Sequence, residues 1–217
     1  MSAPAWLADT RMSYDTVATS YADLLRENLA KEPYDRVTFA LFAELVQAAG
    51  GPVVDVGCGP GRITGHLHRL GLDAFGVDLS PAMIEVARRD HPGLRFEVGS
   101  MTELDLPDAS VAGLLAWFSL IHVPDEAVPA VLAHFHRVLR PGGVLLLGFF
   151  TGDQRRLKTE GYGGHPMNVY VHYRPAERVC GWLHEAGFTV EAQILREQPS
   201  PGAALFARRV EHYTQRV

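Results

Sequence analysis

At residues 53–61 the chain reads Val53-Val54-Asp55-Val56-Gly57-Cys58-Gly59-Pro60-Gly61. Its first four residues form a largely apolar run that is typical of a buried parallel strand. The three alternate glycines that follow let a ligand approach the backbone closely. A helix beginning after Gly61 would point its N-terminus at that ligand. The pattern predicts a strand, a ligand-binding turn and a helix, and the alternative is a tight turn that needs glycine for its geometry alone.

Two residues argue against a dinucleotide at this turn. A dinucleotide fingerprint has glycine at its first, third and sixth places, whereas the sixth place counted from Gly57 is Arg62. Asp55 stands just before the turn, and a buried carboxylate there would repel a diphosphate but suit an ammonium or sulfonium group. Arg62 either meets a carboxylate of the ligand or lies solvated at the start of the helix.

Strands and helices alternate after this turn. We expect four further strands within the first 150 residues, at 74–77, 94–98, 111–117 and 144–150. The helices between them are expected at 61–70, 80–90 and 124–139. Such βαβ units form a mainly parallel sheet with helices on both faces, and its ligands bind beyond the carboxyl ends of the strands.

The flanking segments differ from this core. Two helices are expected before it, at 13–31 with Ser13 as N-cap and at 34–49 with an apolar stripe that includes Val37 and Leu41. Residues 151–168 show no periodicity, and a loop of this length is typical of a binding loop or lid. A helix at 175–186 and a hairpin of two strands, at 188–197 and 203–210, are expected to complete the fold, with one strand antiparallel.

Composition limits the class of protein. A length of 217 residues predicts one domain, and a net charge of −5 argues against a general nucleic-acid or anionic-membrane surface. Two separated cysteines, Cys58 and Cys180, provide neither a disulfide framework nor a cysteine zinc site. No apolar run approaches the length of a membrane span, and no secretory signal is evident. We therefore expect a cytoplasmic protein without membrane or nucleic-acid partners, and its oligomeric state stays open.

A second motif follows the next predicted strand. Asp78 ends that strand, where an acid accepts hydrogen bonds from ribose hydroxyls or, alternatively, caps the helix that begins near Ser80. With this motif the sequence resembles the class I S-adenosylmethionine-dependent methyltransferases of the small-molecule type. The resemblance covers about residues 35–210 and rests on residues 55–61, on Gly76-Val77-Asp78-Leu79-Ser80 with Met83, and on Leu139-Arg140-Pro141-Gly142-Gly143.

The resemblance implies a complete fold. It predicts an α/β, Rossmann-like, doubly wound sheet of seven strands in the order 3-2-1-4-5-7-6, with strand 7 antiparallel. The single domain 1–217 would comprise N-terminal cap helices (1–50), a cofactor-binding core (51–150), a lid after strand 5 (151–174) and a C-terminal helix with strands (175–217).

The resemblance also implies S-adenosylmethionine as the cofactor, without a metal. Asp55 would organise the turn or meet the amino group of the cofactor, and Asp78 would hold its ribose. Many relatives bind the adenine amino group with an aspartate after the third strand, where this sequence has Ser100. The residues expected to bind the cofactor are Tyr21, Asp55, Gly57, Cys58, Gly59, Asp78, Leu79, Met83, Ser100, Met101 and Trp117.

The methyl acceptor is expected between the end of the fourth strand and the lid. His122 is the candidate catalytic base, because an unperturbed imidazole accepts a proton at neutral pH; alternatively it caps the next helix or packs under the lid. The aromatic and histidine-rich lid suits a flat acceptor, or it forms a packing surface between molecules. Tyr14 either reaches over the cofactor or packs as an ordinary helix residue. The predicted acceptor contacts are Tyr14, Ser119, His122, Tyr162, His165, Met167 and Tyr170.

Together these features predict an enzyme that transfers a methyl group from S-adenosylmethionine to a small organic acceptor, aromatic or a natural product. Transfer to oxygen, nitrogen or carbon is compatible with the sequence. One alternative is an NAD(P)-dependent oxidoreductase, which Arg62 and Asp55 disfavour. The other is a non-catalytic module that binds S-adenosylmethionine.

Overall fold

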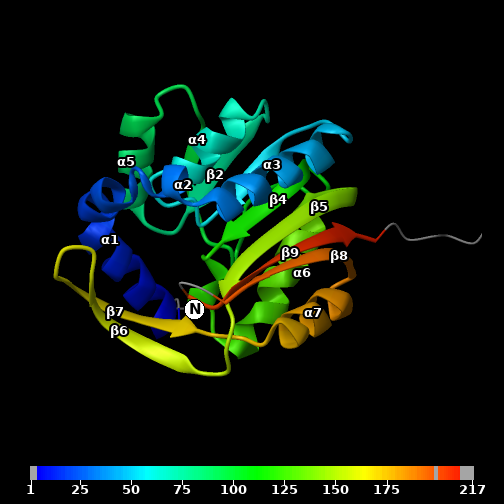
Figure 1. Cartoon of the computed structure of the whole chain (residues 1–217). Helices are drawn as coiled ribbons and strands as arrows, with labels where there is room; N and C mark the ends of the chain where they lie inside the picture. Colours follow the sequence, from blue (N-terminus) through cyan, green and yellow to red (C-terminus); the bar gives the residue numbers. More distant parts are fainter. Residues whose placement is uncertain (1–3, 198–199, 211–217) are drawn as a thin grey trace, which may run out of the picture.

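A seven-stranded sheet runs through the centre of the computed structural model, which describes residues 4–197 and 200–210 (Figure 1). Its strands are β1 (Val53–Val56), β2 (Ala74–Asp78), β3 (Phe96–Val98), β4 (Val111–Trp117), β5 (Leu139–Phe150), β8 (Phe188–Arg196) and β9 (Gly202–Arg209). They lie in the order β3-β2-β1-β4-β5-β9-β8, and β9 is antiparallel to both of its neighbours. The predicted doubly wound sheet with an antiparallel last strand is therefore confirmed.

Helices cover both faces of this sheet. They are α1 (Ala5–Leu25), α2 (Asn28–Lys31), α3 (Pro33–Gln47), α4 (Arg62–Arg69), α5 (Pro81–Asp90), α6 (Val128–Val138) and α7 (Ala176–Glu185), with short 3₁₀ turns η1 (Leu120–His122) and η2 (Asp125–Ala127). Val53 and Leu115 pack with α3 and α4, whereas Val54 and Leu114 face α6 and α7 on the other side (Figure 1). Because both faces are covered, the central strands are apolar at successive positions.

The first helix begins eight residues earlier than predicted. It starts at Ala5, and Ser13 is a buried residue within the helix instead of its N-cap. The Ser13 hydroxyl accepts a hydrogen bond from the backbone N–H of Asn168 at 2.8 Å. Trp6 packs against the core beneath the sheet, so tertiary packing sets the start of this helix.

The buried face of α3 also differs from the prediction. Val37 is 66% exposed and Leu41 is 37% exposed, although both were expected on the apolar stripe. Phe39, Phe42 and Val46 are fully buried against the sheet instead. The two aromatic rings bury more apolar area than the aliphatic side chains do, and the helix is rotated accordingly.

The segment after β5 is an ordered hairpin, and the expectation of a loop without regular structure is wrong. It contains the antiparallel strands β6 (Arg155–Gly161) and β7 (His165–His172). Met167 and Val169 alternate along β7 with exposed neighbours and pack against α1, which in turn packs against α5. Figure 1 shows this hairpin, which we call the lid hairpin, running alongside α1.

The C-terminal strands form the predicted hairpin, and residues 198–199 of its connection lie outside the described residues. Residues 1–3 and 211–217 of the predicted domain lie outside them as well. Within the described part of the chain, no helix is both long enough and apolar enough to cross a membrane.

Candidate active site

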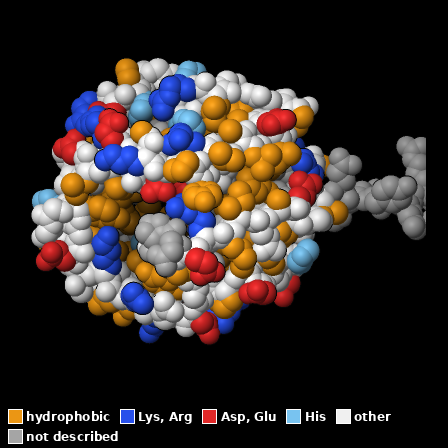
Figure 2. Space-filling view, viewed as in Figure 1, with side chains coloured by type: hydrophobic (Ala, Val, Ile, Leu, Met, Phe, Trp, Pro, Cys, Tyr) orange, Lys and Arg blue, Asp and Glu red, His pale blue; other side chains and the backbone are white. Residues whose placement is uncertain are grey.

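A cavity opens at the carboxyl ends of β1 and β4, where the strand order of the sheet reverses. This is the place where open α/β sheets bind ligands. The first cavity has a volume of about 750 Å³ with its open mouth included. Figure 2 shows one face of the molecule hollowed, with hydrophobic side chains around the opening and charged ones at its rim.

The glycine-rich turn forms the floor of this cavity. Gly57 and Gly61 have positive φ angles of 78° and 77°, and a Cβ atom on Gly57 would lie 2.3 Å from Cβ of Ser119. These two glycines are therefore required for the geometry of the turn. Gly59 shares the positive φ, at 54°, but the nearest atoms to a Cβ there would be 4.0 Å away and the residue faces the cavity. All three glycines therefore fit the backbone geometry of the turn, and the open space at Gly59 also leaves room for a ligand.

Asp78 connects this turn to the start of α5. Its two carboxylate oxygens accept hydrogen bonds from the backbone N–H groups of Gly59 at 2.7 Å and Ser80 at 2.8 Å. The N-cap of α5 is Ser80, whose hydroxyl accepts from the backbone N–H of Met83. Burial raises the pKa of Asp78 to about 6. The carboxylate lines the cavity with lone pairs that suit the hydroxyls of a ribose.

Asp55 lies deeper, at the end of β1. It is 1% exposed and accepts a hydrogen bond from the Thr64 hydroxyl at 2.7 Å. Burial raises the pKa of Asp55 to about 7, against a weaker lowering by this hydrogen bond. A buried carboxylate with so little compensation favours a cationic group nearby.

The opposite end of the first cavity is apolar. Leu79, Met83 and Met101 line it together with Ser100. The Ser100 hydroxyl is hydrogen-bonded to the Thr102 hydroxyl at 2.7 Å and accepts from the backbone N–H of Thr102. This end provides flat apolar contacts for a base, with one hydroxyl among them.

A second cavity of about 1240 Å³, again with its open mouth included, continues from the first. The two share Tyr14, Tyr21, Gly57, Gly59, Trp117 and Phe118. The second also reaches Arg62, whose Nη1 is buried without a hydrogen-bond partner in the described part of the chain. A buried guanidinium nitrogen left unpaired is costly, and a carboxylate of a ligand would satisfy it. The chain therefore presents a glycine cradle, a ribose-compatible carboxylate and a cation for a carboxylate, which together fit S-adenosylmethionine.

His122 lies at the boundary between the sheet and the lid hairpin. Its Nδ1 is 2.9 Å from the carbonyl oxygen of Tyr170 and its Nε2 is 2.7 Å from the hydroxyl of Tyr14. A carbonyl only accepts, so Nδ1 carries the proton and Nε2 accepts from the Tyr14 hydroxyl. Burial lowers the pKa of His122 to about 4 and raises the pKa of Tyr14. The ring is therefore neutral, and its lone pair is directed at Tyr14.

The other predicted residues divide into two groups. Tyr21, Trp117 and Ser119 line the first cavity, and Cys58 and Tyr162 line the second. Cys58 is buried, and burial raises the pKa of its thiol.

The lid hairpin holds the second group, which lies away from both cavities. Met167 packs against α1, and His165 borders Gly163 at the turn of the hairpin. The Tyr170 side chain is exposed and lines a separate cavity with Trp6 and His122, and its carbonyl contacts His122 Nδ1.

Two residues of the site have no clear sign in the sequence. Phe118 lines both cavities with a positive φ of 51°, a strained conformation for a residue with a Cβ. Asp15 accepts from the Ser80 hydroxyl at 2.6 Å and so fixes α1 over α5. The sequence signal for Asp15 is limited to its position next to the predicted site residue Tyr14. The positive φ of Phe118 cannot be predicted from the residue type.

Comparison with known proteins gives a consistent result. A family model described as a methyltransferase domain matches residues 53–143. An O-methyltransferase, cnsE, of Penicillium expansum is 28% identical over 214 residues, covering 89% of this chain and 77% of that protein. An uncharacterized methyltransferase of Mycobacterium tuberculosis is 40% identical over 114 residues, covering 51% of this chain and 44% of its own length.

A solved structure shares the fold. It is the 1,6-didemethyltoxoflavin-N1-methyltransferase of Burkholderia thailandensis, with bound 1,6-didemethyltoxoflavin and S-adenosylhomocysteine. Its TM-score is 0.63 at 23% identity, covering 89% of this chain and 91% of that chain.

Proposed function

Because the chain belongs to the class I S-adenosylmethionine-dependent methyltransferases, we propose that it methylates a small, flat organic acceptor that carries an exchangeable proton. Its cofactor is S-adenosylmethionine. A nicotinamide-dependent oxidoreductase is set aside, since the matched domain and the named relatives are methyltransferases.

The continuous pair of cavities is the observation that carries the proposal. The second cavity meets the first at Gly57 and Gly59, so an acceptor there would lie next to the methionine end of the cofactor. Its walls include six aromatic side chains, Tyr14, Tyr21, Trp117, Phe118, Phe150 and Tyr162. Aromatic walls favour a flat acceptor and exclude water from the reacting atoms.

The names of two similar proteins support an acceptor of this size. The Penicillium expansum relative is named an O-methyltransferase, and the Burkholderia thailandensis structure contains a small ring compound, 1,6-didemethyltoxoflavin. We infer a small natural product as the acceptor class for this chain as well.

The cofactor would be held by residues from three elements, β1, β2 and α4. Asp78 would accept from the ribose hydroxyls, Arg62 would pair with the carboxylate, and Asp55 would favour the amino group. When bound, S-adenosylmethionine supplies a methyl group on a cationic sulfonium that becomes a neutral thioether.

Tyr14 and His122 are proposed to move the proton of the acceptor. Both ring nitrogens of His122 are engaged, so the imidazole acts through the Tyr14 hydroxyl instead of touching the acceptor. Tyr14 would accept the proton of the acceptor and pass its own to His122 Nε2, while Nδ1–H stays bonded to the Tyr170 carbonyl. Methyl transfer converts the cationic sulfonium into a neutral thioether, so the site loses a positive charge. Protonation of the imidazole restores that charge, and this favours the protonated form of His122 against the lowering of its pKa by burial.

Two measurements test the proposal. Titration of the protein with S-adenosylhomocysteine should show saturable binding, and absence of binding would overturn the cofactor assignment. Methyl-labelled S-adenosylmethionine is then incubated with a panel of flat hydroxylated and aminated ring compounds. Labelled product on at least one member is expected; binding without turnover on any of them would favour the non-catalytic alternative.

A further inference from the structure

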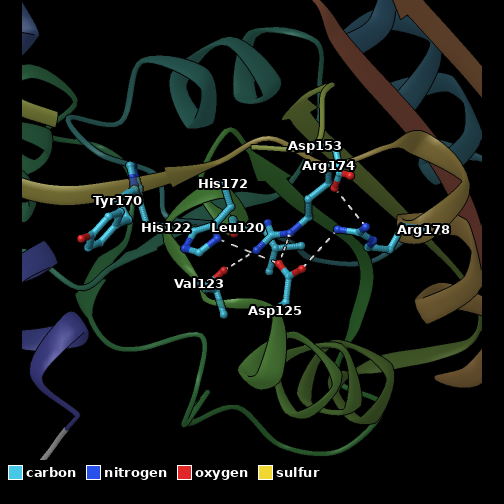
Figure 3. Close-up of polar contacts among 9 residues, drawn as sticks. All are labelled: Leu120, His122, Val123, Asp125, Asp153, Tyr170, His172, Arg174 and Arg178. Carbon is cyan, nitrogen blue, oxygen red and sulfur yellow. Dashed lines mark hydrogen bonds and ion pairs between the residues drawn. The ribbon is translucent and has the colours of Figure 1, made fainter. Parts of the chain in front are cut away.

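Arg174 is a buried arginine that lines neither cavity. It is 1% exposed, and burial lowers the pKa of its guanidinium while Asp125 opposes that shift. Its Nε donates to Asp125 Oδ1 at 2.9 Å, its Nη1 to the carbonyl of Leu120 at 3.1 Å, and its Nη2 to the carbonyl of Val123 (Figure 3). Burying a charge is costly unless its partners are fixed in this way.

The two carbonyls belong to the turn that carries His122. Leu120 and Val123 lie on either side of His122 in η1 and its C-cap, so one planar guanidinium holds both ends of the turn. A lysine at position 174 would carry a compact ammonium group, which cannot donate to both carbonyls and to Asp125 in the geometry of the planar guanidinium. The position of the imidazole is therefore linked to the position of Arg174.

Arg174 also lies at the base of the lid hairpin. Its backbone N–H donates to the carbonyl of Phe150, and the N–H of Tyr173 donates to the carbonyl of Gln154. These bonds join the segment entering the hairpin to the segment leaving it. The carbonyl that His122 Nδ1 contacts, that of Tyr170, lies on the same hairpin.

We propose that Arg174 is a positioning residue for methyl transfer, which holds the η1 turn and the lid hairpin so that His122 Nε2 faces the Tyr14 hydroxyl. The inference rests on the proposed role of Tyr14 and His122, and it adds a residue that contacts neither cofactor nor acceptor. Asp125, at the start of η2, pairs with the guanidinium and neutralises its charge.

Arg178 provides a matched control. It also contacts Asp125, at 3.5 Å, and it pairs with Asp153, yet it is 41% exposed and makes no bond to the carbonyls of η1 (Figure 3). Exposed pairs of this kind contribute little to stability. Arg178→Ala therefore removes a neighbouring charge without releasing the turn.

The test records long-range ¹H–¹⁵N spectra of histidine-labelled protein, with the His122 signals assigned from their loss in His122→Asn. In the wild type Nδ1 is expected to be protonated and Nε2 unprotonated. Arg174→Lys should bring the two nitrogen signals toward each other, because the released ring exchanges between tautomers. Arg178→Ala should leave them unchanged, and S-adenosylhomocysteine affinity should stay within about twofold in both variants.

Asp125→Asn serves as a second variant, since its side chain is partly exposed and its amide oxygen can still accept from Arg174 Nε, so the guanidinium keeps a partner while the negative charge is removed. It should shift the His122 signals in the same direction by a smaller amount, and it decides the question if Arg174→Lys does not fold. Wild-type His122 signals in the folded variants would overturn the inference. Failure of the wild type to bind S-adenosylhomocysteine would instead overturn the proposed function, because Arg174 lies outside both cavities.

Discussion

The hydroxyl of Tyr14 lies 2.7 Å from Nε2 of His122, across 108 positions of sequence. This contact joins α1 to the turn after β4 and closes one side of the first cavity. Since the second ring nitrogen is bonded to the lid hairpin, the imidazole links three elements that are far apart in the chain. The pair therefore behaves as one unit, and removing either member should have similar consequences.

Replacement of Tyr14 by phenylalanine should lower methyl transfer to an acceptor by about 10²–10⁴-fold, the usual contribution of a general base. His122→Asn should have a similar effect, and the double variant should be no worse than the poorer single one. Initial rates at saturating cofactor measure this. Tyr34→Phe, at an exposed position on α3, is the control. Additive losses in the double variant would contradict a shared role.

Arg62→Ala should weaken S-adenosylhomocysteine binding by about 10–100-fold, since a charge-assisted bond contributes roughly 1.5–3 kcal/mol. The unpaired Nη1 is the physical reason. The same variant should bind 5′-methylthioadenosine as the wild type does, because that ligand lacks the carboxylate. Calorimetric titration of both ligands measures the difference.

Arg69→Ala, at the exposed end of the same helix, is the matched control for Arg62 and should change neither affinity. Equal losses for both ligands in Arg62→Ala would place the guanidinium elsewhere in the site.

Binding of S-adenosylhomocysteine should strengthen as the pH rises through about 6. The pKa of Asp78 is raised to about 6 by burial, and ribose hydroxyls donate to the carboxylate and not to the protonated acid. Affinity is therefore lost as the pH falls below this value. Asp78→Asn should flatten this part of the profile, whereas Asp73→Asn, at the exposed opposite end of β2, should keep it. An unchanged profile in Asp78→Asn would assign the titration to another group.

Gly57→Ala should lower the thermal midpoint by several degrees, because the added Cβ meets Ser119 at 2.3 Å and the positive φ costs about 1–2 kcal/mol. Gly57→Ala with Ser119→Gly should recover the part due to the collision. Gly59→Ala makes no such collision, so it should cost less stability and act mainly on cofactor affinity. Differential scanning calorimetry separates these outcomes, and equal losses at both glycines would contradict the roles assigned to them.

Local patterns predicted the core of this fold. The glycines of residues 53–61, the acid at Asp78 and the N-cap at Ser80 act through neighbours in sequence, and each lies where its motif implies. The strand order follows from the motifs and the family they resemble. The sheet could therefore be predicted from the sequence, together with several residues that line the proposed cofactor cavity.

Long-range packing accounts for what was missed. The face of α3 is chosen by Phe39 and Phe42 against the sheet, and the regular hairpin at 155–172 depends on α1 to bury one side of β7. The bonds of Arg174 to the η1 carbonyls cross more than 50 positions and involve backbone atoms, which residue type does not reveal. The proposed acceptor side of the site is assembled from such contacts, so the sequence alone predicts it less completely.

Asp55 should make the unliganded protein less stable as the pH rises from 5 to 8. Its pKa is raised from the usual 3.8 to about 7 by burial. A raised folded-state pKa stabilises the protein fully below the unfolded value and loses this contribution as the pH rises through 7. At 1.36 kcal/mol for each pH unit, the loss between pH 5 and the folded-state value of about 7 amounts to about 3 kcal/mol.

Asp55→Asn removes this titration while its amide oxygen still accepts from the Thr64 hydroxyl, so the margin by which the variant is more stable than the wild type should be larger at pH 8 than at pH 5. Urea unfolding at both values measures the difference, with Asp105→Asn as an exposed control. Asp78, with a pKa raised to about 6, titrates in the same pH range, so the stability of Asp55→Asn should still fall with pH, but less steeply than that of the wild type. If wild type and Asp55→Asn lose the same stability over this range, the carboxyl of Asp55 is not the group that carries the cost.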